Sequence, residues 1–461
     1  MDHDILALLG DVRSVAARPG CHVEPADHNG LTRGGLAEYH ALRHEAFVDR
    51  QGLFDRHDLD DRDTDPRTVV LVARDAAGTV LGGVRLGPVD DGPDLGWWQG
   101  GRLVVAPGSP RGTGTALVRA ACARAESEGA LRFEATVQAR HERMFGRLGW
   151  STVRPVTVAG TDHVLMRWPI GRIAALARSA KGSLGPLLRG LTGVPGFVGD
   201  DGVPVPGSDL VAACDAIVPS MVERDPEWAG WCSVLVNVND LAAMGAEPVA
   251  LLDALGARDA SFASRVLSGL RRASTAYGVP VLGGHTQFGV PASLSVTALG
   301  RTADPVPGGG GVAGQRVWLT ADLSGHWRPG YTGRQWDSTS GRRTPELRDL
   351  VGAVARARPA AAKDVSMAGI AGSLGMLAEA SGCGAVLDVA SVPRPVAATV
   401  GDWLTCFPGF AMLTAGAPAP AQAAVTAACG ELVPGSGVTL RWPDGELTPA
   451  VTGGVTGLGE S

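Results

Sequence analysis

The stretch NVNDLAAMGAEP, residues 237–248, determines how the second half of this chain is interpreted. It holds two of the three asparagines in the sequence, and places them beside an aspartate directly after an apolar run. Oxygen-bearing side chains at the end of a rigid strand or helix suit magnesium and phosphate. Alternatively, Asn237, Asn239 and Asp240 only cap a helix that begins at Leu241. The stretch alone leaves both interpretations open.

Length, composition and net charge limit the classes of protein to which this chain can belong. A chain of 461 residues predicts two or three domains. Its 45% hydrophobic and 19% charged content is that of a globular protein, and a net charge of -6 gives no basic footprint, so a nucleic-acid partner is not expected. Lysine occurs only at positions 181 and 363, and arginine supplies the other positive side chains.

The cysteines and the apolar runs bear on localisation. Seven scattered cysteines, an odd number with no C-x-x-C pair, favour neither a disulfide framework nor a zinc site. Residues 1–10 lack the basic region of a signal peptide. No apolar run reaches the roughly 18 residues of a membrane span. We therefore expect a cytoplasmic protein that does not bind membranes.

The first domain begins with alternating helix and strand signals. A helical pattern covers Leu36 to Phe47, and two β-rich runs, Thr68–Arg74 and Val80–Leu86, flank an Asp/Gly turn and predict a hairpin. Another strand, Gly101–Pro107, leads into the glycine-containing turn RGTGTA at 111–116, which opens a helix. Such a turn exposes backbone N–H groups at the positive end of a helix, where a pyrophosphate binds, although a plain strand-to-helix connection has the same pattern.

The order of these elements resembles the GNAT family of acyl-CoA-dependent N-acyltransferases. The resemblance covers about residues 30–168 and includes the strand Phe133–Val137 and the segment His141–Trp150. It implies that strand residues Leu103, Val104 and Val105 hydrogen-bond the pantetheine and the acyl carbonyl of acetyl-CoA or another acyl-CoA. It further implies that the amides of Arg111, Gly112, Thr113, Gly114, Thr115 and Ala116 hold the CoA pyrophosphate.

One position departs from this family. Phe145 stands where many members carry a tyrosine that protonates the leaving thiolate, and phenylalanine donates no proton. Glu134, His141 and Tyr39 are alternative groups, but surface or core packing explains each of them better, so none of the three is expected to be catalytic. The activity of this domain is therefore left open.

The second part, after a basic helical linker, carries acidic and glycine-rich sites near strand ends. Lys181, in the linker, either reaches a phosphate or is solvated. Asp200 and Asp201 follow in a turn, Asp215 ends a strand, and Gly283, Gly284, His285 and Thr286 stand in the next glycine-rich stretch. Ligands collect at strand ends in open α/β folds.

This succession of motifs resembles the superfamily of aminoimidazole ribonucleotide (AIR) synthetase, thiamine-phosphate kinase and selenophosphate synthetase. The resemblance runs from about Val194 to the C-terminus and implies ATP- and Mg²⁺-dependent phosphorylation of a substrate oxygen, with a homodimer formed through the AIR synthase-like domain. It also implies particular site residues. The Mg²⁺ ligands are Asp200, Asp201, Asp215 and Asp240; the nucleotide contacts are Asn237, Asn239, Gly283, Gly284 and Thr286; and the candidate catalytic residues are Lys363, Asp364 and His285.

Two departures from this superfamily matter. The kinase motif D-x-S-D-G-L reads Asp364-Val-Ser-Met367-Ala-Gly369 here, so its second aspartate is replaced and one residue is inserted. Lys363, next to it, either contacts phosphate or forms a helix-end salt bridge. The G-G-H sequence that ends at His285 resembles that of selenophosphate synthetase. However, no Cys precedes a Lys in the 170–200 region, which disfavours selenium chemistry.

We therefore expect an α/β and α+β multidomain protein, a GNAT fold followed by a two-part AIR synthase-like module. Its expected divisions are 1–168 (acyltransferase), 169–193 (helical linker), 194–304 (ATP/Mg²⁺ domain) and 305–461 (C-terminal domain). The expected function is bifunctional catalysis on small molecules. The alternatives are a small-molecule kinase with an inactive GNAT scaffold and a non-catalytic nucleotide- or CoA-binding regulator. The substrates of both reactions are left open.

Overall fold

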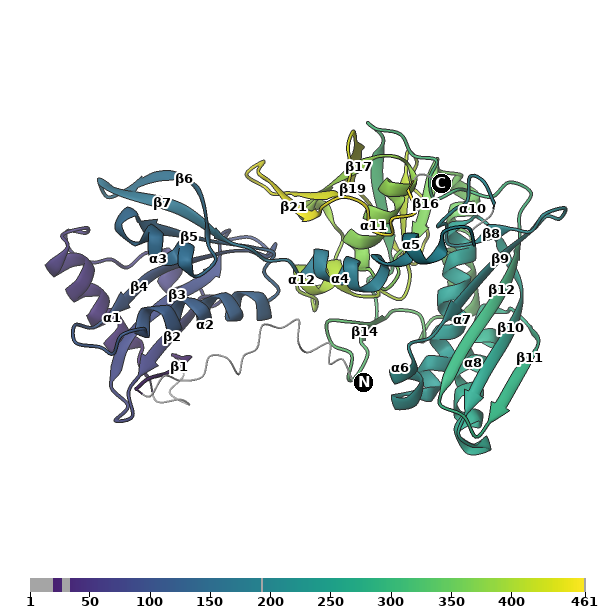
Figure 1. Cartoon of the computed structure of the whole chain (residues 1–461), viewed down its shortest axis with the longest axis horizontal. Helices are drawn as coiled ribbons and strands as arrows, with labels where there is room; N and C mark the ends of the chain where they lie inside the picture. The colour runs from purple at the N-terminus through teal and green to yellow at the C-terminus, as the bar shows by residue number, and fades with distance from the viewer. Residues whose placement is uncertain (1–19, 27–33, 192–193, 460–461) are drawn as a thin grey trace. The chain divides into compact units, whose positions relative to one another are not determined.

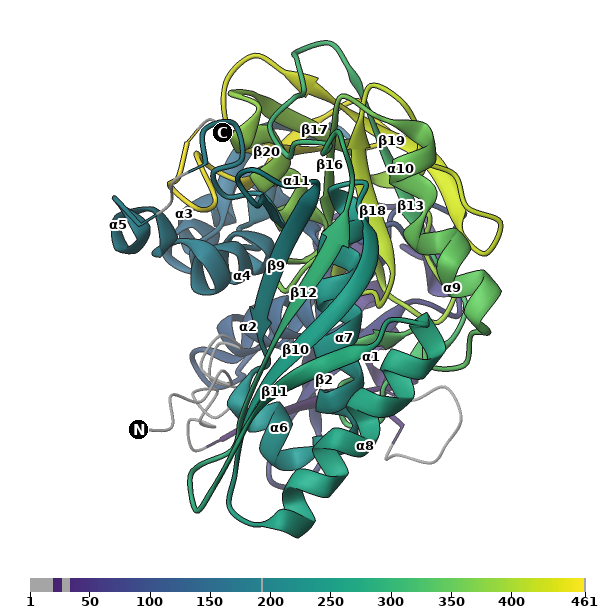
Figure 2. The same cartoon turned by 90° about the vertical axis from the view of Figure 1, so that its right-hand side faces the viewer.

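The computed structural model describes residues 20–26, 34–191 and 194–459 (Figures 1 and 2). The expectations for residues 1–10 and for the last two linker residues, 192–193, fall outside this part. The chain divides into two compact units: residues up to Arg172 with Thr399–Gly401, and Ile173–Ala398 with Asp402–Ser461. Both units combine helices with β-sheets, so the predicted mixed α/β fold class is confirmed.

The first unit contains a seven-stranded sheet in the order β1-β2-β3-β4-β5-β7-β6. Neighbouring strands are antiparallel except β4 and β5, which are parallel. The strands are β1 (His22–Pro25), β2 (Val69–Arg74), β3 (Val80–Pro88), β4 (Trp97–Val105), β5 (Arg132–Gln138), β6 (Ser151–Val158) and β7 (Thr161–Trp168). The helices are α1 (Leu36–His44), the π-helical turn η3 (Glu45–Arg50), the 3₁₀ turns η4 (Asp61–Asp63) and η5 (Ala139–His141), α2 (Thr113–Ser127) and α3 (Glu142–Arg147).

Alternation along β2 explains how helices cover both faces of this sheet. Leu71 and Ala73 belong to the core cluster that includes Leu117 of α2, whereas Val70 and Val72 belong to the cluster that includes Tyr39 of α1. Successive side chains of a strand point to opposite faces, so one apolar strand serves both layers. The β2–β3 pairing confirms the predicted hairpin.

The second unit begins with a five-stranded sheet in the order β11-β10-β12-β9-β8. Its elements are β8 (Val203–Pro204), β9 (Leu210–Ala216), α6 (Pro219–Arg224), α7 (Pro226–Ala243), β10 (Glu247–Ala257), α8 (Ala260–Tyr277), β11 (Val281–Phe288) and β12 (Ser293–Arg301). Leu251, Leu255 and Val296 share a buried core with residues of α7 and α8. The opposite face of the sheet points toward the viewer in Figure 2, and β11 is exposed along its length.

Helix α7 corrects one expectation from the sequence. A helix was expected to begin at Leu241, with Asn237, Asn239 and Asp240 as possible caps. Instead α7 begins at Pro226, and these residues lie in its last two turns. Nearly all side chains of α7 are buried, so it lacks the polar stripe by which a helix is recognised in a sequence. The cap interpretation is therefore wrong.

The rest of the second unit holds a seven-stranded sheet in the order β16-β18-β13-β19-β17-β20-β21. The strands are β13 (Arg316–Ala321), β16 (Ala361–Asp364), β17 (Gly384–Asp388), β18 (Ala411–Ala415), β19 (Val425–Val433), β20 (Val438–Arg441) and β21 (Leu447–Val451), with a small sheet of β14 (His326–Trp327) and β15 (Trp336–Asp337). The helices are α4 (Arg172–Lys181), α5 (Leu184–Leu188), α9 (Thr344–Val351), α10 (Ala353–Ala357), α11 (Gly369–Ala380), η6 (Val389–Ser391) and α12 (Val400–Thr405). The apolar helix α11 packs against this sheet with Ile370, Leu374 and Leu377 fully buried.

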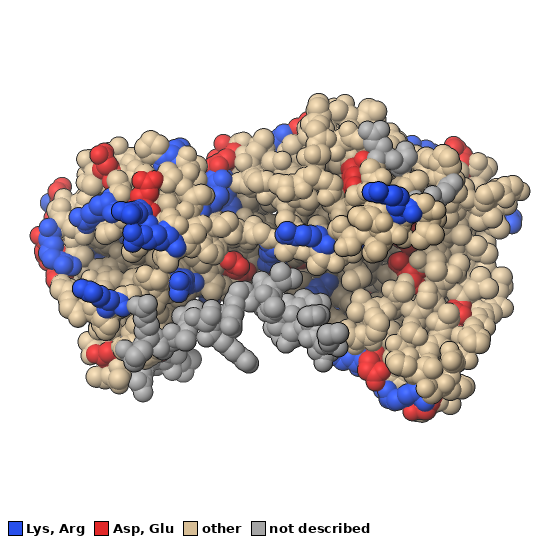
Figure 3. Space-filling model, in the orientation of Figure 1, with Lys and Arg blue, Asp and Glu red and all other residues tan. Residues whose placement is uncertain are grey.

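Cysteines, helices and surface charge bear on the expected localisation and partners. All seven cysteines are free. Within the described residues, no helix combines the length and apolar character needed to cross a bilayer. The face in Figure 3 is mostly uncharged, and the side chains coloured by charge are interspersed rather than joined into a continuous basic surface.

Candidate functional site

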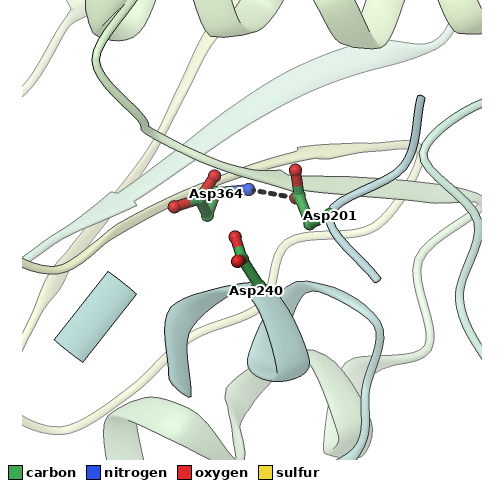
Figure 4. A group of neighbouring side chains, drawn as sticks. All are labelled: Asp201, Asp240 and Asp364. Atoms are coloured by element: carbon green, nitrogen blue, oxygen red, sulfur yellow. Dashed lines mark hydrogen bonds between the residues drawn. The ribbon is translucent and has the colours of Figure 1, made fainter. Parts of the chain in front are cut away.

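Three carboxylates from distant segments converge in the second unit. Asp201 lies in the loop before β8, Asp240 in the last turn of α7, and Asp364 at the end of β16. One oxygen of each lies within 4.8 Å of the others, and Figure 4 shows the three side chains turned toward one another. The helix and the strand fix two of these groups on rigid elements, which suits a site that must hold its geometry.

Two consecutive residues of β16, Lys363 and Asp364, hold the side chain of Asp201. Lys363 Nζ donates to one of its oxygens, and the backbone N–H of Asp364 donates to the other at 2.9 Å. Lys363 is buried. Burial alone lowers the pKa of Lys363, but the charges of Asp201, Asp364 and Asp200 outweigh it and raise that pKa above its usual value. Lys363 is therefore a fixed cation within an acidic cluster.

The cluster concentrates negative charge in a buried place. Burial raises the pKa of Asp240 well above its usual value, and repulsion from Asp364 and Asp215 adds to the effect. Burial and the charge of Asp201 do the same to the pKa of Asp364. A cation that enters this cluster removes the repulsion, so the geometry favours cation binding.

Asp200 lies at the edge of the cluster. One of its oxygens accepts the N–H of Gly308 at 2.9 Å, and the other is buried without a hydrogen-bond partner. Burial raises the pKa of Asp200 to about 6. A Cβ on Gly308 would stand 2.6 Å from the Asp200 carboxylate, so only glycine leaves room for this contact. Gly308, the first residue of the glycine run at 308–311, therefore supports an acidic side chain.

Asp215 and Lys181 border the same cluster. Desolvation by neighbouring atoms raises the pKa of Asp215, although the side chain keeps an exposed surface at the end of β9. The positive charge of Lys181 opposes this rise, and it also opposes the rise in the pKa of Asp364. Lys181 is half-buried at the end of α4. Both lysines of the chain therefore act on the acidic cluster, a role that the sequence left undecided for Lys181.

The two asparagines of α7 use their amide nitrogens within the protein. Asn237 Nδ2 donates to the carbonyl oxygen of Ser233, and Asn239 Nδ2 donates to that of Gly409. The Oδ1 atoms of both side chains are buried without a hydrogen-bond partner, as is Oδ1 of Asp364. Buried oxygens without a partner are costly unless a ligand satisfies them. Of these atoms, Oδ1 of Asp364 belongs to a member of the acidic cluster, and carboxylate oxygens of this kind suit Mg²⁺, so the three carboxylates fit that ion.

The glycine-rich stretch of β11 lies apart from the cluster within one chain. Gly283, Gly284, His285 and Thr286 are all exposed on this edge strand. Two strands, β10 and β12, separate β11 from β9, which carries Asp215. The nucleotide-contact and catalytic roles suggested for this stretch therefore remain predictions, since the described contacts do not join it to the acidic cluster. Met367, at the replaced aspartate, is exposed.

The first unit has a cavity where two parallel strands separate. β4 and β5 pair only from Trp97 to Gly100 on β4, and Arg102, just beyond, has a positive φ of 52°. The cavity at this opening has a volume of about 540 Å³, and Leu103, Val104, Val105 and Gly114 are among the residues that line it. The predicted pantetheine-binding strand therefore borders a cavity.

The expected pyrophosphate loop lies at the N-terminus of α2. Gly112 precedes the helix with a φ of 99°, a conformation that favours glycine. Arg111, Gly114, Thr115 and Ala116 surround this end of the helix, but the amide of Ala116 bonds to the Gly112 carbonyl. The Thr113 amide bonds to the Pro110 carbonyl. Amides in the first turn of a helix otherwise lack intrahelical partners. The loop thus offers fewer free amides than the six expected.

The three groups considered in place of a tyrosine have different environments. Glu134 forms ion pairs with Arg132 and Arg167, so its charge is compensated. The Tyr39 hydroxyl donates to the Arg102 carbonyl at 2.8 Å, and burial raises the pKa of Tyr39 above its usual value. His141 lines the cavity, as does Phe145. Of these three groups, only His141 lines the cavity and can exchange a proton there.

The family matches fall separately in the first and second units of the chain. Residues 199–302 match the family model of the AIR synthase related protein N-terminal domain, and 312–434 match that of its C-terminal domain. Residues 36–150 match the acetyltransferase (GNAT) family. The acidic cluster thus draws Asp201 and Asp240 from one matched domain and Asp364 from the next.

Individual relatives match the second unit. The chain is 34% identical over 261 residues to the uncharacterized protein sll0787 of Synechocystis sp., across 53% of this chain and 80% of that protein. It is 31% identical over 219 residues to a thiamine-monophosphate kinase of Methanospirillum hungatei, across 43% of this chain and 75% of the kinase. Other such kinases are covered less fully; 40% of that from Archaeoglobus fulgidus is matched. The structure of T. maritima PurL complexed with ATP shares the fold alone, with a TM-score of 0.50 at 16% identity over 63% of this chain and 52% of that chain.

Proposed function

Because the chain belongs to the AIR synthase related family and also carries a GNAT-family acetyltransferase domain, we propose that it is a bifunctional small-molecule enzyme. The second unit uses ATP to phosphorylate an oxygen atom of a small substrate, and the first transfers an acyl group from acyl-CoA to an amine. The observation that carries this proposal is the convergence of Asp201, Asp240 and Asp364 with Lys363.

In the second unit, the acidic cluster provides the ligands for phosphoryl transfer. Asp201, Asp240 and Asp364 would hold Mg²⁺, with Asp200 and Asp215 at its edge. When bound, this ion neutralises charge on the transferred phosphate. Lys363 holds the Asp201 carboxylate in position, and Lys181 adds a positive charge beside the cluster, where it favours an anionic substrate.

In the first unit, the cavity at the opening between β4 and β5 receives the acyl thioester. The backbone of Leu103 to Val105 borders this cavity and offers hydrogen bonds to the pantetheine arm. Binding the thioester and the amine side by side accelerates their reaction by proximity. The acyl acceptor and the acyl group belong to the small molecules that a 540 Å³ cavity admits.

We further propose that the chain is a cytoplasmic homodimer that assembles through its five-stranded sheet. Leu252, Leu282 and Phe288 are exposed on this sheet, and an exposed apolar edge strand is a pairing site. Leu282→Asp should therefore give a monomer by light scattering. Leu187→Asp, which changes an equally exposed leucine on α5, is the matched control and should remain dimeric. A dimeric Leu282→Asp protein would contradict this interface.

Phe145 favours a second candidate function, a small-molecule kinase whose GNAT domain is a scaffold. Phe145 is buried against Trp150 with the ring centroids 5.4 Å apart. A packing role of this kind does not require turnover. If acetyl-CoA neither binds nor loses its acyl group, the scaffold function replaces the bifunctional one.

Calorimetric titration tests both halves separately. The intact protein is titrated with a non-hydrolysable ATP analogue in the presence and absence of Mg²⁺, and with acetyl-CoA. We expect Mg²⁺-dependent nucleotide binding in the wild type and at least about tenfold weaker binding in Asp240→Asn, because a ligand charge is lost. Acetyl-CoA affinity should be the same in both proteins. Wild-type protein that binds no nucleotide would refute the phosphoryl-transfer proposal.

A further inference from the structure

The lining of the cavity in the first unit restricts how an amine can lose its proton there. Among the described residues that line it, none is aspartate or glutamate. The polar side chains are Arg50, Gln51, Arg102, Thr136, Gln138, Arg140, His141 and His163. Arginine stays protonated, and amides and the threonine hydroxyl do not accept a proton near neutral pH. A general base for this cavity must therefore be one of two histidines.

His163 presents a nitrogen that is ready to accept a proton. It is buried on β7, opposite Gln138 of β5, and its Nδ1 lies 2.9 Å from the carbonyl oxygen of Thr161. A carbonyl oxygen only accepts hydrogen bonds, so in the neutral ring Nδ1 carries the hydrogen. Nε2 then carries the lone pair, and no hydrogen bond from another described residue engages it.

His141 is less suited to this role. Its Nε2 already accepts a hydrogen bond from Arg140 Nε at 3.3 Å. Burial and the adjacent Arg140 charge lower the pKa of His141, which makes it a weaker base. The ion pairs of Glu134 and the hydrogen bond of Tyr39 exclude those groups as well.

We propose that His163 is the general base of acyl transfer in the first unit, an inference that rests on the acyltransferase half of the proposed function. Nε2 of His163 takes a proton from the amine nitrogen as that nitrogen attacks the thioester carbonyl. A C–N bond forms and the C–S bond breaks, giving an amide and the CoA thiolate. The imidazolium of His163 then returns the proton to the thiolate sulfur. One histidine thereby supplies the proton that Phe145 cannot give.

The test measures release of CoA thiol from acetyl-CoA by the full-length protein, with spermidine, tyramine and the common amino acids as acceptors. We expect His163→Gln to lower kcat about 100-fold or more, while its affinity for acetyl-CoA by calorimetry stays within about threefold of the wild type. The retained affinity shows that the unit is folded. Imidazole added to His163→Ala should restore activity, because it fits the space left by the ring and supplies the missing base.

The outcomes separate the inference from the function on which it rests. Rapid transfer by His163→Gln, loss of transfer in His141→Gln instead, or failure of imidazole to restore His163→Ala overturns the role of His163 and leaves the acyltransferase function standing. Wild-type protein that binds acetyl-CoA but transfers its acyl group to none of these amines overturns both.

Discussion

Lys363 and Asp201 form a buried ion pair although 162 positions separate them in the sequence. Lys363 is the next-to-last residue of β16 in the seven-stranded sheet of the second unit, and Asp201 precedes β8, the first strand of the five-stranded sheet. The pair therefore joins the two halves of the second unit. The adjacent N–H of Asp364 binds the same carboxylate. The pair thus positions one member of the acidic cluster and offsets part of the charge concentrated there.

Removing the lysine should destabilise the second unit. Lys363→Met leaves the Asp201 carboxylate beside Asp240 and Asp364 without its cation, and breaking a buried pair costs about 3–5 kcal/mol. Urea unfolding of the intact chain measures the effect. Arg343→Met removes a partner from a pair in which the arginine is 82% exposed, and should change stability by less than about 1 kcal/mol. Equal effects of the two substitutions would show that the Lys363 pair is not important for stability.

The first unit should lose stability in acid through Asp63. Burial alone raises the pKa of Asp63, but hydrogen bonds from Arg43 and from the backbone of Asp60 outweigh it, and the pKa falls well below the usual 3.8. Ionised Asp63 therefore stabilises the fold above pH 3.8, and this contribution is lost as the pH falls toward the lowered pKa. At pH 7, Asp63→Asn should lower the free energy of unfolding by about 3 kcal/mol.

Thermal unfolding between pH 2 and 7 checks this prediction. The difference between wild type and Asp63→Asn should shrink as the pH falls below 3.8. Asp162→Asn, which changes an exposed aspartate of β7, should follow the wild type at every pH. A difference between wild type and Asp63→Asn that is independent of pH would mean that the lost energy is packing rather than charge.

Lys181 should matter for nucleotide binding and little for stability. Lys181 is half-buried and forms no ion pair within 4 Å with a described residue, and its positive charge acts on the pKa values of Asp215 and Asp364. Lys181→Ala should weaken Mg²⁺-dependent binding of an ATP analogue about tenfold, because one favourable charge is lost beside the phosphates. Its unfolding free energy should change by less than about 0.5 kcal/mol. Unchanged nucleotide affinity would show that Lys181 is a solvated linker residue with no part in nucleotide binding.

The sequence predicted the parts of the site that local patterns encode. The β-rich runs predicted the β2–β3 hairpin, and the acid expected at the end of a strand is Asp215, near the end of β9. The motif around Asp240 was recognisable because oxygen-bearing side chains follow an apolar run. Local patterns are enough for such elements because each depends on residues that are close in sequence.

The parts that failed depend on distant contacts. Helix α7 is buried on every side, so no polar stripe marked where it begins. The environment of Lys181 depends on how α4 packs. Ala177 of α4 lies against α11, because a Cβ added to Gly372 of α11 would stand 3.7 Å from the Ala177 side chain. Two strands separate β11 from β9 in the sheet. The order of strands in a sheet cannot be deduced from the sequence of any single strand.

Gly308 provides a test of Asp200 that leaves every charge in place. A Cβ at this position would stand 2.6 Å from Oδ1 of Asp200, closer than such atoms approach, so Gly308→Ala must displace the carboxylate. We expect a loss of about 1–3 kcal/mol in stability and weaker Mg²⁺-dependent binding of an ATP analogue. Gly341→Ala is the matched control, since a Cβ there meets no atom within 4 Å, and its nucleotide affinity should equal that of the wild type. If Gly308→Ala binds nucleotide as tightly as Gly341→Ala while losing stability, Asp200 supports the fold and takes no part in binding the ion.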